Sequence, residues 1–227
     1  MLRKPVAAAI FDMDGLLIDT EAVYIEAYHA AAQAIGTKMP IELCHAMIGV
    51  PTRECEAMIQ DHFGPAFSVE QFRVHFNQHA RLMLDAHVPV KPGAGELLAW
   101  LGGRGLPLAI ATSSRANTVQ RHLGRAGLLD HFKAVATRYD VERGKPHPDV
   151  YLEAARRLGV APERCIAFED SNVGLTAAHA AGTMAIMVPD IVPPTEEARA
   201  KCAAVLPDLN AVLELLRTRG GLGRRLT

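Results

Sequence analysis

The sequence predicts an α/β fold, a Rossmann-like parallel sheet with helices on both faces, joined to a small all-helical domain. Short apolar runs alternate with helix-like segments through most of the chain, which is typical of right-handed crossovers between parallel strands. A long stretch with helical patterns and no convincing strand interrupts this alternation after the first run. We therefore expect a core domain over residues 1–18 and 89–227 and a helical domain over residues 19–88.

The first strand is expected at residues 6–11, because this run is apolar throughout, as strands buried on both faces are. The segment 21–35 has helical spacing, and Gly36 is placed to end it. Further helices are expected at residues 40–48, 53–62 and 69–86. A segment rich in proline and glycine at residues 89–93 then indicates a linker.

After this linker, strands and helices alternate, as a parallel sheet covered on both faces requires. Strands are expected at residues 106–111, 134–136, 165–168 and 184–188, with an edge strand at 203–206. Helices are expected at residues 94–104, 115–126, 148–158, 173–181 and 209–217. Glycines follow several of these segments, as is common at helix C-termini.

Composition excludes several classes of protein. Lysine and arginine total 24 against 25 aspartate and glutamate residues, so the net charge is −1 and no basic stripe indicates a nucleic-acid surface. The four cysteines form no C-x-x-C pair, which indicates free thiols in a reducing compartment. No apolar run approaches the ~18 residues of a membrane span. We expect a cytoplasmic monomer that binds neither nucleic acid nor membrane, with a frayed tail over residues 217–227.

Polar residues suited to phosphate chemistry follow four of the predicted strands. The segment 12–15 follows the first strand, Thr112 the second, and Lys145 lies in a Gly-Lys-Pro turn beyond the third and weaker one. Glu169 and Asp170 follow the fourth. Because the carboxyl ends of parallel strands meet at one edge, where open α/β sheets bind ligands, we expect these groups to converge.

Two aspartates separated by one residue can divide the work of phosphate transfer. Asp12 could attack phosphorus and form an aspartyl phosphate. Asp14 could protonate the leaving oxygen and then deprotonate the attacking water. Gly15 would allow a sharp backbone turn beneath a phosphate. The alternative is an acidic turn or helix cap without a catalytic role.

Thr112 and Lys145 could hold the phosphoryl group. The hydroxyl of Thr112 and the backbone N–H groups after it could bind phosphoryl oxygens at a helix N-terminus, and the alternative is simple capping of that helix. The ammonium of Lys145 would neutralise the charge of a transferring phosphoryl group. The alternative interpretation of Lys145 is an ordinary solvated lysine in a loop.

The adjacent acids Glu169 and Asp170 indicate a divalent cation. Two like charges ~4 Å apart repel by roughly 4 kcal/mol at an effective dielectric of about 20. With Asp12 and Asp14, four carboxylates are expected to face the single Lys145. Either their pKa values rise or a cation joins them, and oxygen ligands beside a phosphate suit Mg²⁺.

Residues 11–15, 111–114, 144–149 and 168–171 resemble the four motifs of the haloacid dehalogenase superfamily in order and spacing. The resemblance extends from about residue 6 to residue 216. It is strongest to the subgroup of beta-phosphoglucomutase and related sugar phosphatases, whose helical cap is inserted just after the first strand. The resemblance therefore implies that the helical segment of this chain is a cap domain.

The resemblance also implies roles for the acidic residues. Asp12 would be the nucleophile and Asp14 the general acid and base. The Asp12 side chain, the Asp14 backbone carbonyl and Asp170 would hold Mg²⁺, with Glu169 bound directly or through water. Thr20 would orient Asp14 without itself contacting the reacting group.

By the same resemblance, Thr112 and Lys145 would bind the phosphoryl group. Ser113 belongs to the same motif and would contribute to phosphate or substrate binding. Ser114 and Arg115 lie where the mutases bind a second phosphate. These three positions are the candidates for substrate contacts in the core domain.

The helical domain offers one further candidate and two departures from the mutases. The segment 49–54 resembles the cap loop whose arginine, here Arg53, reaches the substrate, although a solvated arginine at a helix start is the alternative. Tyr24 replaces a histidine of the mutases, and residues 69–86 lack the lysine that they use. Both departures favour a phosphatase.

The leading hypothesis is a Mg²⁺-dependent phosphatase that hydrolyses a small phosphomonoester, with a phosphosugar as the expected substrate, through an aspartyl-phosphate intermediate. A phosphomutase that returns the phosphoryl group to a bound sugar phosphate is the alternative. A non-catalytic phosphate-sensing module is the third possibility, although such a module needs neither Asp14 nor a large cap.

Overall fold

The structure is a computed structural model that describes residues 5–48, 50 and 52–218. It divides into two compact units, an α/β unit (Met1–Ile18 with Pro89–Thr227) and a helical unit (Asp19–Val88). The predicted frayed tail lies, from residue 219 onward, outside the described residues. Gly49 and Pro51 of the predicted cap loop lie outside them as well.

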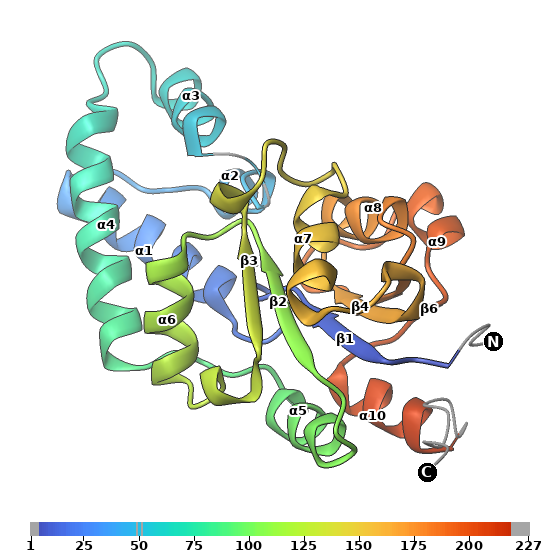
Figure 1. Cartoon of the computed structure of the whole chain (residues 1–227). Helices are drawn as coiled ribbons and strands as arrows, with labels where there is room; N and C mark the ends of the chain where they lie inside the picture. Colours follow the sequence, from blue (N-terminus) through green and yellow to red (C-terminus); the bar gives the residue numbers. More distant parts are fainter. Residues whose placement is uncertain (1–4, 49, 51, 219–227) are drawn as a thin grey trace. The chain divides into compact units, whose positions relative to one another are not determined.

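The described residues of the α/β unit form a six-stranded sheet in which every strand pair is parallel. The order across the sheet is β3-β2-β1-β4-β5-β6, so β1 lies centrally between β2 and β4 (Figure 1). The predicted α/β class is thereby confirmed. The strands are β1 (Ala8–Phe11), β2 (Leu108–Thr112), β3 (Ala134–Thr137), β4 (Cys165–Glu169), β5 (Met184–Met187) and β6 (Ala204–Val205).

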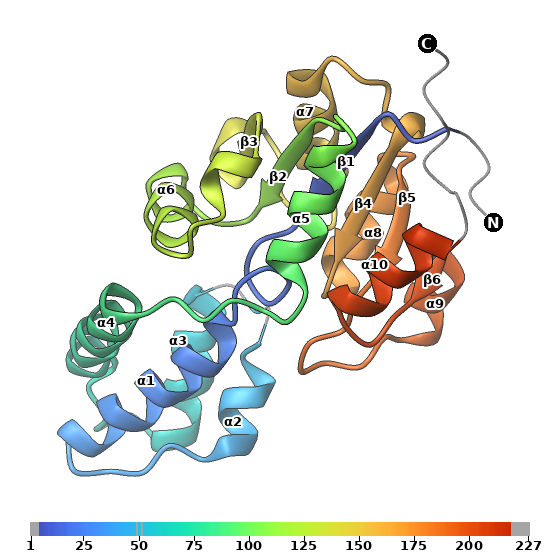
Figure 2. The same cartoon turned by 90° about the horizontal axis from the view of Figure 1, so that it is seen from below.

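Helices cover both faces of this sheet, as the aliphatic composition of the strands requires. Ala8 and Ile10 of β1 pack on one face in a core that includes residues of three of the helices, α7, α8 and α9. Figure 2 shows α5 and α10 on the other face, where Phe11 stacks on Phe168 with ring centroids 4.7 Å apart. The helical segments of this unit are α5 (Ala94–Gly103), α6 (Ala116–Arg125), η1 (Leu129–His131), η2 (Arg138–Asp140), α7 (Asp149–Leu158), η3 (Pro162–Arg164), α8 (Asn172–Ala180), α9 (Glu196–Lys201) and α10 (Leu209–Thr218).

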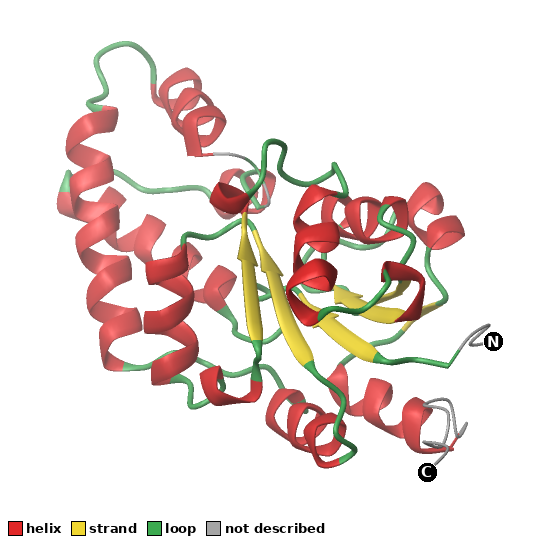
Figure 3. Cartoon of the chain, in the orientation of Figure 1, coloured by secondary structure: helices red, strands yellow, loops and turns green. Residues whose placement is uncertain are grey.

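The helical unit contains helices and loops but no strand among its described residues (Figure 3). Its core is aromatic as well as aliphatic. Tyr28 stacks on Phe76 with centroids 4.4 Å apart and lies 6.1 Å from the ring of Phe72. The helices are α1 (Thr20–Ala34), α2 (Ile41–Ala46), α3 (Thr52–Phe63) and α4 (Val69–Ala86).

Two differences from the predicted elements have simple physical causes. Strand β1 begins at Ala8 rather than at residue 6, because its ladder with β4 begins at the Ala8–Cys165 pair. Helix α9 was not predicted, since its six residues are mostly polar and too few to show an apolar period. Its local signals are the cap Thr195, whose side chain accepts a hydrogen bond from the N–H of Ala198, and the acidic first turn and basic last turn of the helix.

The two connections between the units run side by side where they leave the α/β unit. Ile18 forms an antiparallel bridge with Val90, and the N–H of Lys91 donates to the carbonyl of Leu17 at 2.9 Å. The chain therefore leaves the sheet unit and returns to it at one place.

All four cysteines are free thiols, as their spacing predicted, and three of them are buried. Separately, none of the described helices combines the length and the apolar character that crossing a membrane requires.

Candidate active site

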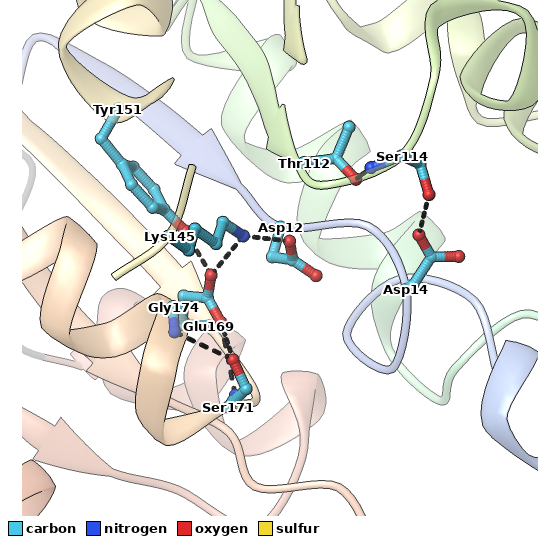
Figure 4. Close-up of polar contacts among 9 residues, drawn as sticks. All are labelled: Asp12, Asp14, Thr112, Ser114, Lys145, Tyr151, Glu169, Ser171 and Gly174. Atoms are coloured by element: carbon cyan, nitrogen blue, oxygen red, sulfur yellow. Dashed lines mark hydrogen bonds and ion pairs between the residues drawn. The ribbon is translucent and has the colours of Figure 1, made fainter. Parts of the chain in front are cut away.

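The carboxyl ends of three neighbouring strands bring polar side chains together (Figure 4). Asp12 comes directly after β1, Thr112 is the last residue of β2, and Glu169 is the last residue of β4. All three are buried, and the N–H of Asp12 donates to the carbonyl of Phe168 at 3.0 Å. The strand register thus fixes the backbone from which these side chains extend.

Three carboxylates form the acidic part of this cluster. Asp12, Glu169 and Asp170 each offer an oxygen, and these oxygens lie within 4.8 Å of one another. The Lys145 ammonium forms ion pairs with Asp12 Oδ1 and, at 2.6 Å, with Glu169 Oε1. One ammonium against three carboxylates leaves excess negative charge in a buried place. The donor set therefore fits a divalent cation that prefers oxygen ligands, such as Mg²⁺.

Burial shifts the acid–base properties of this cluster. Desolvation, only partly offset by the nearby Lys145, raises the pKa of Asp12 to about 7. Desolvation also raises the pKa of Asp170 well above its ordinary value, and the charges of Asp12 and Glu169 add to that effect. Burial opposes the charge of Lys145, but the carboxylates outweigh it and raise the pKa of the ammonium. Lys145 is therefore a permanent cation, whereas Asp12 and Asp170 retain protons more readily than exposed acids.

Glu169 is held by donors on both of its oxygens. Oε1 accepts hydrogen bonds from Lys145 and from the Tyr151 hydroxyl, each at 2.6 Å. Oε2 accepts from the N–H of Ser171 at 3.3 Å and from its hydroxyl at 3.1 Å. A Cβ at Gly174 would lie 1.9 Å from Oε1, so only glycine leaves room for this carboxylate against α8. Glu169 therefore acts as an anchor that holds Lys145 beside Asp12.

The sequence placed Ser171 in the fourth motif without a role, and it did not identify Tyr151 or Gly174 as parts of the site. A signal for Tyr151 was its position on the apolar face of α7, because a buried tyrosine hydroxyl needs a partner. Nothing in the sequence indicated which acid that partner would be.

Asp14 lies apart from this cluster. Its Oδ2 accepts a hydrogen bond from the Ser114 hydroxyl at 2.7 Å, and Figure 4 shows its carboxylate turned toward Ser114 rather than toward Lys145. The expectation that four carboxylates face Lys145 is therefore wrong for the Asp14 side chain. Residues two apart, such as Asp12 and Asp14, share a face only while the chain stays in a strand. Strand β1 ends at Phe11, and Asp14 lies next to the turn at Gly15 (φ +83°), so this alternation does not hold there.

The turn after β1 requires glycine at position 15. Gly15 has φ +83°, and its N–H donates to the carbonyl of Ile18 at 2.9 Å. A Cβ here would lie 2.4 Å from Asp170 Oδ2. Gly15 therefore lets the first loop approach the acidic cluster closely.

The segment after β2 lies beside Asp14. Thr112 Oγ1 accepts a hydrogen bond from the N–H of Ser114 at 3.0 Å, whereas α6 begins after Arg115 without a side-chain cap. The alternative interpretation of Thr112 as a helix cap is therefore wrong. Ser113 is exposed, and the Arg115 guanidinium lies 4.3 Å above the ring of Tyr139.

Two predicted site residues belong to the helical unit. Thr20 is the first residue of α1 and is fully buried. Arg53 lies on α3 and is exposed. Their suggested roles toward Asp14 and the substrate remain predictions.

The sequence and fold place this chain in a known family. The family model described as "Haloacid dehalogenase-like hydrolase" matches residues 9–188. The chain therefore belongs to the haloacid dehalogenase-like hydrolases.

The named relatives of this hydrolase include phosphatases. It is 34% identical over 175 residues to a phosphorylated carbohydrates phosphatase of Thermotoga maritima, which covers 77% of this chain and 81% of the relative. It is 33% identical over 183 residues to a fructose-1-phosphate phosphatase of Escherichia coli, with 80% and 96% covered. A hydrolase of this family from Deinococcus radiodurans, solved with bound phosphate and sodium, matches with a TM-score of 0.83 and 26% identity, over 96% of this chain and 98% of that one.

Proposed function

We propose that this protein is a Mg²⁺-dependent phosphatase that hydrolyses a small phosphomonoester, a phosphosugar, through an aspartyl-phosphate intermediate. The observation that carries the proposal is the buried cluster in which Lys145 is held on Asp12 and Glu169 while Asp170 lies beside them. This cluster combines a nucleophile, a fixed positive charge and an excess of carboxylate oxygens at one edge of the sheet.

Asp12, Asp170 and the backbone carbonyl of Asp14 are the proposed ligands of Mg²⁺. The bound cation would polarise the phosphoryl group and offset its charge. Both oxygens of Glu169 already accept hydrogen bonds, which supports a role for Glu169 as an anchor of Lys145 rather than as a main ligand.

The proposed reaction has two steps. In the first step, an Asp12 oxygen attacks phosphorus, the P–O ester bond breaks, and Asp14 gives its proton to the departing alkoxide. In the second step, Asp14 takes a proton from water, the water oxygen attacks phosphorus, and the bond to Asp12 breaks to release phosphate. Lys145 and Thr112 would bind the phosphoryl oxygens in both steps.

The separation of Asp12 from Asp14 supports this division of roles. Lys145 contacts Asp12 and favours its carboxylate form, whereas Asp14 hydrogen-bonds to the Ser114 hydroxyl outside that ion-pair cluster. Thr20 is the proposed positioning residue for Asp14.

The substrate class follows from the relatives together with the candidate binding residues. Two relatives carry the names of phosphatases for phosphorylated carbohydrates and for fructose 1-phosphate. We place the recognition of the rest of the substrate at Arg53, Ser113, Ser114 and Arg115. A small sugar phosphate matches both the relatives and these polar side chains.

A panel of phosphorylated metabolites, assayed for phosphate release with Mg²⁺ and with EDTA, tests the proposal. We expect Mg²⁺-dependent release from one or more sugar phosphates. Asp12→Asn should lower the rate by ~10⁴-fold or more, on the scale of removing a nucleophile. Retained turnover in the folded variant would contradict the aspartyl-phosphate mechanism.

A phosphomutase remains the second candidate, because Ser114 and the exposed Arg115 are adjacent on the loop after β2. Against it, Tyr24 replaces the histidine of the mutases and packs 5.9 Å from the ring of Phe76. Feeding a hexose 1-phosphate with a bisphosphate primer distinguishes the two functions. Isomerised sugar phosphate instead of free phosphate would support the mutase.

A further inference from the structure

An ion pair outside the four motifs lies next to the acidic cluster. Lys91 Nζ is 2.5 Å from Asp190 Oδ1, and the two side chains are only 19% and 13% exposed. Asp190 lies on the loop after β5, and Lys91 lies on the segment that returns from the helical unit. The pair therefore ties the returning segment to the edge of the sheet that carries the proposed cation site.

The second oxygen of Asp190 faces the same space as Asp170. A Cβ built on Gly15 would lie 2.4 Å from Asp170 Oδ2 and 3.3 Å from Asp190 Oδ2, so both oxygens lie within 3.3 Å of one point. Asp190 Oδ2 is buried and accepts no hydrogen bond from the described residues. A buried carboxylate oxygen without a donor is costly, so its position is explained best by a polar partner that the protein binds.

We propose that Asp190 is a positioning residue for the divalent cation. Its Oδ2 accepts a hydrogen bond from a water molecule on the cation that Asp12 and Asp170 bind, while Lys91 fixes Oδ1. This inference rests on the proposed function, because it needs that cation. Mg²⁺ usually keeps several of its waters, and carboxylates that hold such waters strengthen metal binding.

The competing explanation is purely structural. Asp190 would then serve only to hold Lys91 and the returning segment in place. In that case its loss would lower the melting temperature without changing the affinity for Mg²⁺. Cation binding measured without substrate therefore separates the two explanations.

Isothermal titration of the full-length protein with MgCl₂ provides this measurement. We expect Asp190→Asn to weaken Mg²⁺ binding by about 10-fold, the lower end of the effect of residues that support metal ligands. Glu153→Gln is the matched control, because Glu153 is a similarly buried carboxylate (15% exposed) in ion pairs with Arg156 and Arg157 on α7. It should leave the Mg²⁺ affinity unchanged.

Asp170→Asn separates failure of this inference from failure of the proposed function. If Asp170→Asn loses Mg²⁺ binding and Asp190→Asn keeps the wild-type affinity, Asp190 has no role toward the cation and the inference is overturned. If Asp170→Asn itself binds Mg²⁺ normally, the proposed cation site is wrong and the inference falls with it.

A double variant covers the case in which Asp190→Asn does not fold. Lys91→Met combined with Asp190→Leu replaces the buried ion pair with an apolar pair, a change that often preserves or increases stability. We expect this protein to fold and to bind Mg²⁺ about 10-fold more weakly than the wild type. Wild-type affinity in the folded double variant would overturn the inference.

Discussion

The two units hold their candidate functional residues in different ways. In the α/β unit, Asp12, Lys145 and Glu169 come from distant parts of the chain and are fixed by ion pairs and hydrogen bonds to one another. In the helical unit, the core consists of apolar side chains and stacked rings, and the candidate Arg53 is exposed. Fixed groups suit bond-making steps, whereas an exposed arginine suits recognition of a variable substrate.

This difference predicts that changes in the two units affect different kinetic constants. Substitutions in the buried cluster of the α/β unit should lower kcat, because they alter groups proposed to act on the phosphoryl centre. Substitution of Arg53 in the helical unit should raise KM, because it alters a proposed contact with the rest of the substrate. The variants below test that separation.

Among the variants that compare the two units, Lys145→Met should give the largest effect. We expect kcat to fall by ~10²–10³-fold, because the charge on the phosphoryl oxygens loses a fixed partner. The free energy of unfolding without Mg²⁺ should also fall by about 3 kcal/mol, since two buried carboxylates lose their counter-ion. Kinetics and urea unfolding measure the two effects, with Lys201→Met as the control, because Lys201 pairs with the exposed Glu197 on α9. An unchanged kcat would contradict the role of Lys145.

Mg²⁺ affinity should increase with pH between about 5 and 7. Burial raises the pKa of Asp12 to about 7 and also raises the pKa of Asp170. Below pH 7 the cation must therefore displace protons from these carboxyl groups. Each displaced proton makes the affinity rise by up to ~10-fold per pH unit until the carboxyls are ionised. Titration calorimetry at several pH values checks this expectation. A flat profile would mean that these acids are ionised throughout the range.

Arg53→Ala should raise KM for the sugar phosphate by about 10-fold, the loss of one charge-assisted hydrogen bond. The value of kcat should change little. A small aryl phosphate that lacks the sugar provides the control, because its KM should be the same in both proteins. An equal loss with both substrates would assign Arg53 to the phosphoryl site and weaken the contrast between the units.

Tyr151→Phe should give the smallest effect. The variant keeps the ring and removes the hydroxyl that donates to Glu169 Oε1 at 2.6 Å. We expect kcat to fall roughly 5-fold with KM unchanged, in line with the ~1 kcal/mol of one hydrogen bond. Tyr139→Phe is the matched control, since Tyr139 is 60% exposed. A change in KM alone would contradict a role for Tyr151 in positioning Lys145.

Local signals in the sequence predicted much of the fold. Helix α4 has the predicted bounds, because Ser68 caps it and its apolar residues recur over many turns. Asp12, Thr112 and Glu169 were identified because a strand end is visible as the end of an apolar run. Helix α9 was missed because it is too short to show a period.

Contacts between distant segments account for what the sequence did not reveal. Tyr151 approaches Glu169, and Asp190 approaches Lys91, only after the strands are ordered in the sheet. Asp14 was expected to face Lys145, but the Gly15 turn directs it to Ser114 instead. The residues next to each other in the sequence predict neither which distant side chains pair nor which way a loop turns.

The bridge between Ile18 and Val90 has a consequence for engineering. Paired residues on adjacent strands lie only ~5 Å apart, a gap that a two-residue turn can close. The entire insert could therefore be excised, or exchanged for one from another enzyme, without changing the strand register of the remaining scaffold. The helical unit is thus an insert that can be exchanged at a single junction, while the sheet keeps its strand order.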